Sequence, residues 1–329
     1  MTALAETTGR PAHMAPGYRR MFVADALTLG VFFPIEAFSH DNPTMEKQEQ
    51  LAKRAEELGF AALWFRDVPL RDPSFGDVGQ VYDPWVYLAW IAAHTREIAL
   101  ATGAIILPLR HPIHTAKAAA SLDRLAGGRL VLGVATGDRP AEFPAFGVPL
   151  ETRGAQFREN FHVLKSVLRD SFPALESIYG RMQNVDLVPK PAGKLPVLVT
   201  GASQQPIEWI AEHADGWVVY PRVASVQKQV AEAWNSTVER VAPGSRKPLA
   251  QSLYIDLSAN PKEPPSPVHL GFRSGREALL HYFEQLRDAK ISHVVLNLKY
   301  GRRPADEVLD EIGCEIVPKL APNVWSSFS

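Results

Sequence analysis

The stretch from Ile98 to Ala135 reads IALATGAII, LPLRHP, IHTAKAAASLDRL, AGGR and LVLGVA, and it contains one complete strand–helix–strand unit. Its first and last segments are short apolar runs, which are typical of parallel strands covered by helices on their outer face. Between them Ile113–Leu125 is expected to form a helix, and Gly127–Gly128 turns the chain into the next strand. The unit predicts a parallel sheet built from alternating strands and helices.

The same alternation continues in both directions along the chain. Each apolar run is followed by a polar loop and an amphipathic stretch, so about eight strand–helix units occur in order. That count is typical of a closed (β/α)₈ barrel. We therefore predict a single (β/α)₈ TIM barrel with small insertions after the second, fourth and seventh strands. The runs are Leu29–Phe33, Ala61–Phe65, Ile98–Ile106, Leu130–Ala135, Val197–Thr200, Trp217–Tyr220, Leu249–Leu257 and His293–Leu298.

Several start signals predict where the helices begin. Asn42–Pro43 and Asp83–Pro84 each offer an N-cap followed by a proline at the first helical position. Ser274 and Glu277 have the spacing of a capping box. Other helices are expected over about 151–169, 204–213 and 305–319, with one ending near 241 and a small hairpin over 177–191.

The alternative fold is a doubly wound open sheet. No Gly-x-Gly-x-x-Gly motif follows any run, which favours the barrel. The Pro-rich stretch Ala259–Leu270 lies between the seventh strand and its helix, so it is expected to be a barrel loop and not a linker. We expect a flexible N-terminal arm over 1–22 and one barrel domain over 23–329.

Composition excludes several classes of protein. The 329 residues carry 35 basic and 36 acidic side chains, so the chain lacks the excess of basic charge that would indicate a nucleic-acid partner. Cys314 is the one cysteine, which rules out an internal disulfide, and the spacing of His111 and His114 around Pro112 does not predict a metal site. No apolar run of about 18 residues predicts a membrane span, and the polar N-terminus lacks a signal sequence. The interpretation is a cytoplasmic protein.

In a barrel of this class the reactive groups lie on the loops that follow the strands. Gly201, Ala202 and Ser203 follow the fifth run directly before an expected helix. Small residues let a ligand approach the backbone, and free N–H groups of a first helical turn can hold a phosphate. The alternative for Ser203 is a plain N-cap. Thr136 with Gly137, after the fourth run, is a second candidate phosphate contact.

Certain stretches together resemble the bacterial luciferase-like flavin monooxygenase family. The match covers about 29–221 and is weaker afterwards, where it depends mainly on the order of the repeats. The stretches that carry it are Gly103–Pro112, Lys117–Leu125, Gly127–Val134, Ala55–Phe60, Glu142–Phe143, Phe146–Gly147, Arg153–Gly154, Leu187–Pro191, Val199–Ser203, Glu208–Trp209 and Asp215–Trp217.

The resemblance implies a (β/α)₈ barrel that binds FMN or, in one branch, the deazaflavin coenzyme. It implies that Gly201, Ala202 and Ser203 face the FMN phosphate. Thr136 stands where some members have an arginine for that phosphate, and Pro206 lacks the N–H that a first helical turn could offer. Gly103–Ala104 matches the place where the family often has a non-prolyl cis peptide under the flavin ring.

The chain departs from the family pattern after the second strand. Light-emitting and related members carry a histidine near the reacting flavin carbon, whereas this chain reads Arg66-Asp67-Val68-Pro69. Val68 cannot exchange a proton, so Asp67 and Arg66 are the predicted catalytic contacts, with a structural ion pair as the alternative. Phe33, Trp64 and Tyr220 are expected to line the ring or else to belong to the barrel core.

The resemblance implies a flavin-dependent monooxygenase that uses oxygen and reduced FMN, supplied by a flavin reductase, on a small organic substrate. A non-oxygenating flavin-binding protein, or a nicotinamide-linked or deazaflavin reductase, stays open as the alternative. A homodimer is expected, with no nucleic-acid or membrane partner. The long segment 69–83 and the Pro-rich segment are expected to cover the flavin.

Overall fold

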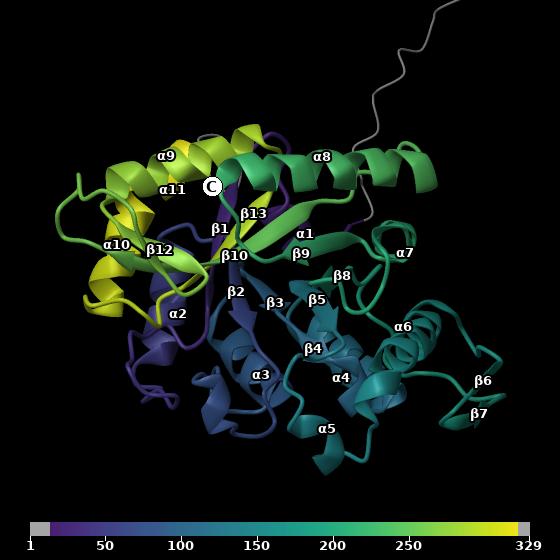
Figure 1. Ribbon diagram of the computed structural model, residues 1–329. Coiled ribbons are helices and arrows are strands. Elements are labelled where there is room, and N and C mark those ends of the chain that lie inside the picture. Colours follow the sequence, from purple (N-terminus) through teal and green to yellow (C-terminus); the bar gives the residue numbers. More distant parts are fainter. Residues whose placement is uncertain (1–13, 322–329) are drawn as a thin grey trace, which may run out of the picture.

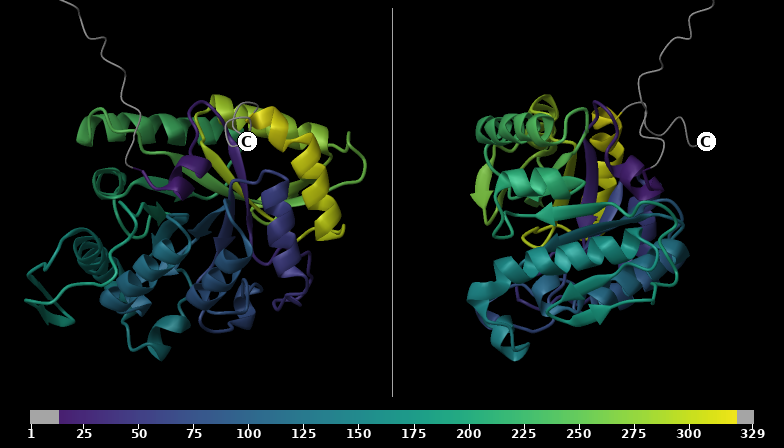
Figure 2. Two further views of the ribbon diagram at one scale, coloured as in Figure 1. Left: turned by 180° about the vertical axis from the view of Figure 1, so that it is seen from behind. Right: turned by 90° about the vertical axis from the view of Figure 1, so that its right-hand side faces the viewer.

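The computed structural model describes residues 14–321. Eight parallel strands form a closed barrel, because β9 pairs with β10 and β13 pairs with β1. Figures 1 and 2 show this barrel with helices around it. The prediction of a (β/α)₈ barrel is confirmed. The barrel strands are β1 (Thr28–Phe32), β2 (Ala62–Phe65), β3 (Ala99–Thr102), β5 (Leu130–Ala135), β8 (Val197–Thr200), β9 (Gly216–Val219), β10 (Leu249–Leu257) and β13 (His293–Asn297).

Each barrel strand is followed by a helix, as the sequence predicts. Three strands, β5, β8 and β10, have the bounds of their apolar runs, and the others differ by one or a few residues. The helices are α2 (Gln48–Glu57), α3 (Pro84–His94), α4 (Pro112–Leu125), α6 (Arg153–Arg169), α7 (Ile207–His213), α8 (Ala224–Val241), α9 (Arg276–Asp288) and α10 (Ala305–Glu315), after which α11 (Val317–Leu320) follows.

Additional elements lie between the strands and the helices. The β2–α3 segment, residues 66–83, contains a short 3₁₀ turn. The Pro-rich segment is not a simple loop, because β11 and β12 form an antiparallel hairpin that extends the sheet beside β10. The further elements are β4 (Ile105–Ile106), η1 (Pro73–Phe75), η2 (Leu107–Leu109), α5 (Glu142–Ala145), η3 (Leu150–Thr152), β6 (Leu175–Ser177), β7 (Gly180–Met182), β11 (Ser266–Val268) and β12 (Gly271–Ser274).

Two predicted helix starts are wrong. Helix α2 begins at Gln48 and not after Pro43, because the Glu36 carboxylate accepts hydrogen bonds from the N–H groups of Thr44 and Met45 and holds a loop there. The capping box before α9 does not form either. Ser274 ends strand β12, and the N-cap position belongs to Gly275 without a side-chain hydrogen bond.

The chain before β1 closes the amino-terminal end of the barrel. Helix α1 (Pro16–Met21) donates the Gly17 N–H to the carbonyl of Gly128, which precedes β5. Tyr18, Met21 and Phe22 are buried and form one cluster with interior side chains such as Trp64. The expected loose arm therefore does not extend over residues 14–22, and residues 1–13 lie outside the described part of the chain.

A buried histidine completes the floor of the barrel. The Trp64 indole N–H donates to His293 Nε2 at 3.0 Å, so His293 Nδ1 carries the ring proton and lies 2.7 Å from Thr28 Oγ1. The Thr28 hydroxyl in turn donates to the Met21 carbonyl. Burial lowers the pKa of His293 to about 3, so the ring is neutral and part of the core.

Candidate active site

Side chains alternate along each strand, so the residues that face the barrel axis at its carboxyl-terminal mouth follow from the interior set. Arg66 lies two residues after the interior Trp64, and Tyr254 lies four residues after the interior Ala250. Phe33 has the opposite parity and packs against Phe65 at 4.8 Å between ring centroids, on the side of α3. Phe33 therefore belongs to the barrel core, the second of its two expected positions. Phe32 faces the axis beside Trp64.

The Gly103–Ala104 peptide is cis, as the family resemblance implies. A Cβ atom added at Gly103 would lie 2.9 Å from Trp64 Cε3 and 3.1 Å from Phe32 Cε1. A glycine is therefore required for the backbone to rest directly on these two rings. The result is a smooth apolar surface at the mouth, formed by backbone above aromatic side chains.

The turn that follows β8 has the geometry of an anion-binding site. Gly201, Ser203 and Gln204 have φ angles of 62°, 46° and 56°. The N–H groups of Ala202, Ser203 and Gln204 donate no hydrogen bond to any described residue. Consecutive N–H groups left free in such a turn form a concave nest that binds anions. The predicted phosphate position at 201–203 therefore has free donors.

The Ser203 side chain has a role different from both expectations. Its hydroxyl donates to the Thr200 carbonyl at 2.7 Å, so it does not cap α7. That helix begins at Ile207 after Pro206, with no side-chain cap. The hydroxyl proton is thus already used, and the anion-binding capacity of this turn lies in its backbone.

Helix α6 begins beside this turn and adds charge to it. A Cβ atom at Gly154 would lie 2.8 Å from Gln204 Cβ, so the first turn of α6 touches the nest. Arg153 Nε, Gln156 Oε1 and Thr200 Oγ1 are buried polar atoms without a partner in the described chain. Sequence reasoning used Arg153 only as a family match and did not assign it a contact. Its position beside a predicted phosphate site was visible only once α6 and β8 were brought together.

The second candidate phosphate contact, Thr136 with Gly137, lies in a closely packed loop. Thr136 is buried, and a Cβ atom at Gly137 would lie 2.9 Å from Ile106 Cγ2, so the glycine is needed for close packing. Tyr220 connects this loop with the nest. Its hydroxyl lies 3.5 Å from Asp138 Oδ2, and its ring is next to Gly201.

The structure separates the two predicted catalytic residues. Asp67 accepts two hydrogen bonds of 2.7 Å from Arg110 and one of 3.1 Å from the Ile106 N–H, and only 1% of its side chain is exposed. It forms a structural ion pair on the outer side of β2. Arg66 faces the mouth instead and pairs with Asp77 at 2.8 and 3.2 Å.

Asp77 joins the β2–α3 segment to the mouth. Besides Arg66, its carboxylate accepts the Gly79 N–H at 2.9 Å and the Tyr254 hydroxyl at 3.3 Å. Burial, the largest single effect, would raise the pKa of Asp77, but Arg66, the Gly79 N–H and the nearby Lys299 together hold that pKa below its ordinary value. The carboxylate is therefore ionised at neutral pH. Sequence reasoning missed Asp77 because it lies inside a long segment without a local motif.

The β5 loop holds the same segment from the other side. Arg139 donates to the Asp77 carbonyl at 2.5 Å, and its guanidinium lies 4.3 Å from the centroid of the Phe75 ring. Glu142 is buried in the same place, and its Oε1 has no hydrogen-bond partner between residues 14 and 321. Burial, the largest effect, raises the pKa of Glu142 to about 7. The segment is thus fixed to β2, β5 and β10 at once.

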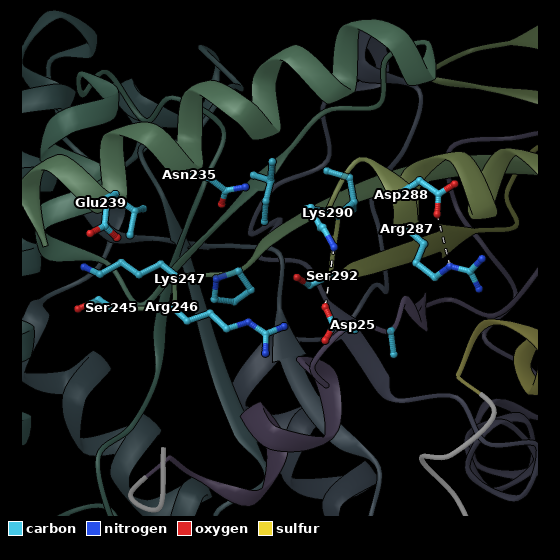
Figure 3. Close-up of a pocket in the computed structure, with 15 residues that line it drawn as sticks. Asp25, Asn235, Glu239, Ser245, Arg246, Lys247, Arg287, Asp288, Lys290 and Ser292 are labelled. Atoms are coloured by element: carbon cyan, nitrogen blue, oxygen red, sulfur yellow. Dashed lines mark ion pairs between the residues drawn. The ribbon is translucent and has the colours of Figure 1, made fainter. Parts of the chain in front are cut away.

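A pocket of about 450 Å³ lies at the opposite end of the barrel, where β1, β10 and β13 begin. Figure 3 shows its polar side chains, which come from α8, α9 and the adjoining loops. Lys290 lies 3.8 Å from Asp25 there. None of its lining residues has a buried polar atom without a partner. The candidate site is therefore at the mouth.

Two further features bear on function. Between residues 14 and 321 no group of three or more His, Cys, Asp or Glu side chains is placed to hold a metal ion. None of the helices in that range has the length and apolar character needed to span a bilayer.

Comparison with known proteins agrees with this architecture. The chain is 30% identical to an uncharacterized protein of Mycobacterium tuberculosis over 230 residues, which are 64% of this chain and 79% of that protein. It is 27% identical to the 4-hydroxyprotoasukamycin monooxygenase of Streptomyces nodosus over 235 residues, 68% of this chain and 61% of the relative.

Solved structures share the fold at low sequence identity. An F420-dependent secondary alcohol dehydrogenase has a TM-score of 0.72 at 17% identity, covering 91% of this chain and 99% of its own. The oxygenating constituent of 3,6-diketocamphane monooxygenase from Pseudomonas putida, in complex with FMN, has a TM-score of 0.69 at 14% identity, covering 90% and 99%. A family model described as luciferase-like monooxygenase matches residues 27–264. The chain therefore belongs to the luciferase-like monooxygenase family.

Proposed function

We propose that the protein is a flavin-dependent monooxygenase that uses reduced FMN and molecular oxygen on a small organic substrate. The observation that carries the proposal is the turn after β8, where three consecutive N–H groups have no partner in the described chain. A phosphate bound there would place a ring system over the mouth of a barrel whose family is named for monooxygenases.

The residues present fit such a cofactor. The free N–H groups of Ala202, Ser203 and Gln204 would hold the phosphate, with Arg153 as the nearby cation. The Gly103 backbone, which lies directly on the Trp64 and Phe32 rings, would support a flat ring. When bound, reduced FMN would supply the activation of oxygen and the transfer of one oxygen atom to the substrate.

The chain itself would bind, orient and exclude water. The β2–α3 segment, held by Asp77 and Arg139, would cover one side of the ring, and the β11–β12 hairpin would flank another. Enclosure strengthens every polar contact inside the site and suppresses the loss of activated oxygen to water. Arg66 would set the polarity near the reacting carbon, and Asp67 would position the wall of the site through Arg110.

A second candidate function is flavin binding without oxygenation, as in a reductase or a deazaflavin enzyme. Val68 favours it, since relatives that emit light keep a proton-handling side chain at the corresponding place. The fold is also shared with an F420-dependent dehydrogenase. The monooxygenase proposal also includes a homodimer, a separate flavin reductase partner and a location in the cytoplasm.

One series of measurements tests these alternatives. Oxidised FMN and F420 are titrated separately into the purified chain, and FMN is expected to bind at least tenfold more tightly. The complex with reduced FMN is then mixed with oxygen in the presence of a panel of small organic compounds. An oxygenated product supports the monooxygenase. Tighter binding of F420, or return to oxidised flavin without product from any compound, would favour the second candidate.

A further inference from the structure

The side of the mouth opposite the phosphate nest contains two cations, Arg66 and Lys299, and among the described residues only Arg66 has a direct carboxylate partner. Arg66 pairs with Asp77, and Lys299 follows β13 on the same side of the barrel. Lys299 is only 3% exposed, yet no carboxylate in the described chain lies within 4.0 Å of its ammonium group. Asp77 and Asp41 act on Lys299 only from a distance, so its ammonium group has no direct counterion in the described chain.

The contacts of Lys299 are neutral. Its ammonium group donates to the His40 carbonyl at 2.6 Å and lies 3.7 Å from the centroid of the Phe38 ring. Burial lowers the pKa of Lys299, and the nearby Asp77 opposes that effect. A buried cation without a counterion is costly, so proteins usually keep one where an anion binds.

Arg66 has an unused donor in the same place. Its Nε atom is buried and has no hydrogen-bond partner among the described residues. A Cβ atom at Gly79 would lie 3.2 Å from that atom, so the β2–α3 segment lies directly over it. Displacing this segment would expose the planar face and edge of a guanidinium, which bind carboxylates with two parallel hydrogen bonds.

Aromatic side chains form the adjoining wall. Tyr254 lies 5.2 Å from Tyr300 and 5.9 Å from His269 between ring centroids, and His269 lies on the exposed rim. The Lys299 ammonium lies 5.7 Å from the Tyr300 centroid. Rings at these spacings accept a further aromatic ring at their edge or face.

We propose that Arg66, Lys299 and Tyr254 form the subsite for an aromatic carboxylate substrate, whose place the Asp77 carboxylate fills while the β2–α3 segment is closed. The inference deepens the proposed function and rests on it for the reaction, but the binding it predicts is independent of flavin. The Asp77 carboxylate shows how a substrate carboxylate would bind, because it already lies between the Arg66 guanidinium and the Tyr254 hydroxyl.

The probe is benzoate, compared with its neutral isostere benzamide, by calorimetric titration into the full chain with and without FMN. Wild type is expected to bind benzoate at least tenfold more tightly than benzamide. Lys299→Met should weaken benzoate about tenfold and leave benzamide unchanged. Asp77→Asn should tighten benzoate several-fold, because the internal competitor loses its charge. If Asp77 had only a structural role, Asp77→Asn would not tighten benzoate binding.

The control is Lys290→Met, which removes a lysine from the pocket at the opposite end of the barrel. It should leave benzoate binding unchanged. If Lys299→Met is poorly folded by circular dichroism, Lys299→Gln replaces it with the same expectation. Equal affinity for benzoate and benzamide, or weaker benzoate binding by Asp77→Asn, would overturn the inference. FMN affinity is measured in every variant, so that loss of flavin binding with benzoate binding intact counts against the proposed function alone.

Discussion

Glu142 is the clearest residue whose protonation affects the stability of the fold. The residue is 2% exposed, its Oε1 has no partner among the described residues, and its pKa rises from the ordinary 4.5 to about 7, chiefly through burial. The folded protein therefore keeps this proton between about pH 4.5 and 7, where the unfolded chain releases it. The free energy of unfolding falls as pH rises through this window and stays low above it.

Replacing Glu142 by Gln removes the cost of the buried charge. We expect the variant to unfold with a free energy higher than wild type by about 2–3 kcal/mol at pH 8, and by much less at pH 5. Denaturant unfolding at the two pH values measures this difference. Glu232→Gln, an exposed residue on α8, is the control. A difference that does not depend on pH would contradict the assignment.

Ser203 and Gly201 separate the contribution of the hydroxyl group from that of the backbone. Since the Ser203 hydroxyl is bonded to Thr200, Ser203→Ala should change FMN affinity by less than about threefold, well under 1 kcal/mol. Gly201→Glu should weaken FMN at least a hundredfold, because it adds a carboxylate beside the phosphate and a side chain at φ 62°. Fluorescence titration with FMN distinguishes the two variants. A large loss of FMN affinity in Ser203→Ala would mean that the hydroxyl group contacts the phosphate.

The contacts of Asp67 predict an effect on the stability of the fold more than an effect on catalysis. Asp67→Ala would leave the Arg110 guanidinium without its main partner and the Ile106 N–H without an acceptor. Loss of a largely buried pair is expected to cost about 2–4 kcal/mol of unfolding free energy, since Arg110 keeps partial contact with water and with Asp83. Thermal unfolding measures it. A stable variant with abolished oxidation would restore the catalytic interpretation.

Among the single elements, the function of the β2–α3 segment can be tested most simply. Its contacts with the mouth include the Asp77 carboxylate and the Phe75 ring, and Gln80 exchanges hydrogen bonds with the Arg66 backbone. Deleting Asp72–Gly79 should leave FMN affinity within about threefold and raise the hydrogen peroxide released per substrate oxidised, because water gains access. A peroxidase-coupled assay measures that release. If release is unchanged while a dimer dissociates, the segment is an interface between subunits.

Elements also show how far sequence reasoning reaches. The strands were predictable because runs such as Leu130–Ala135 are apolar on both faces, a property that burial in a parallel sheet requires. The start of α2 was not predictable from its neighbours, since it depends on the side chain of Glu36, which lies outside the helix. The β11–β12 hairpin was missed because prolines and polar residues conceal it.

The candidate site also contains features that could be predicted from the sequence and features that could not. The turn at 201–203 and the cis peptide at Gly103–Ala104 could be predicted from contiguous residues that match a family. Asp77, Tyr254 and Lys299 could not be grouped from sequence, because the closure of the barrel brings together strands distant in the chain. Local patterns identify what a strand end carries, whereas partners across the mouth are set by the fold.

For the whole molecule, one face of α3 is the best candidate for subunit contact. Val86 is 70% exposed and Trp90 54%, and Tyr82 adjoins them, although large apolar side chains rarely cluster on a free surface. We expect a homodimer through this face, so Trp90→Glu should shift the mass measured by light scattering toward the monomer. Phe172→Glu, equally apolar and exposed on a distant loop, should not. A wild-type monomer would remove this prediction.

Helix α1, together with the hydrogen-bonded chain from Trp64 through His293 to Thr28, fills the amino-terminal end of the barrel, so ligands reach the candidate site from the mouth. Substrate and product are then expected to use the same route. A product that lingers blocks the next substrate, so product inhibition should be competitive with substrate. A protein that delivers reduced flavin must approach the same rim, which means that delivery and substrate entry take turns and the order of addition is fixed by geometry.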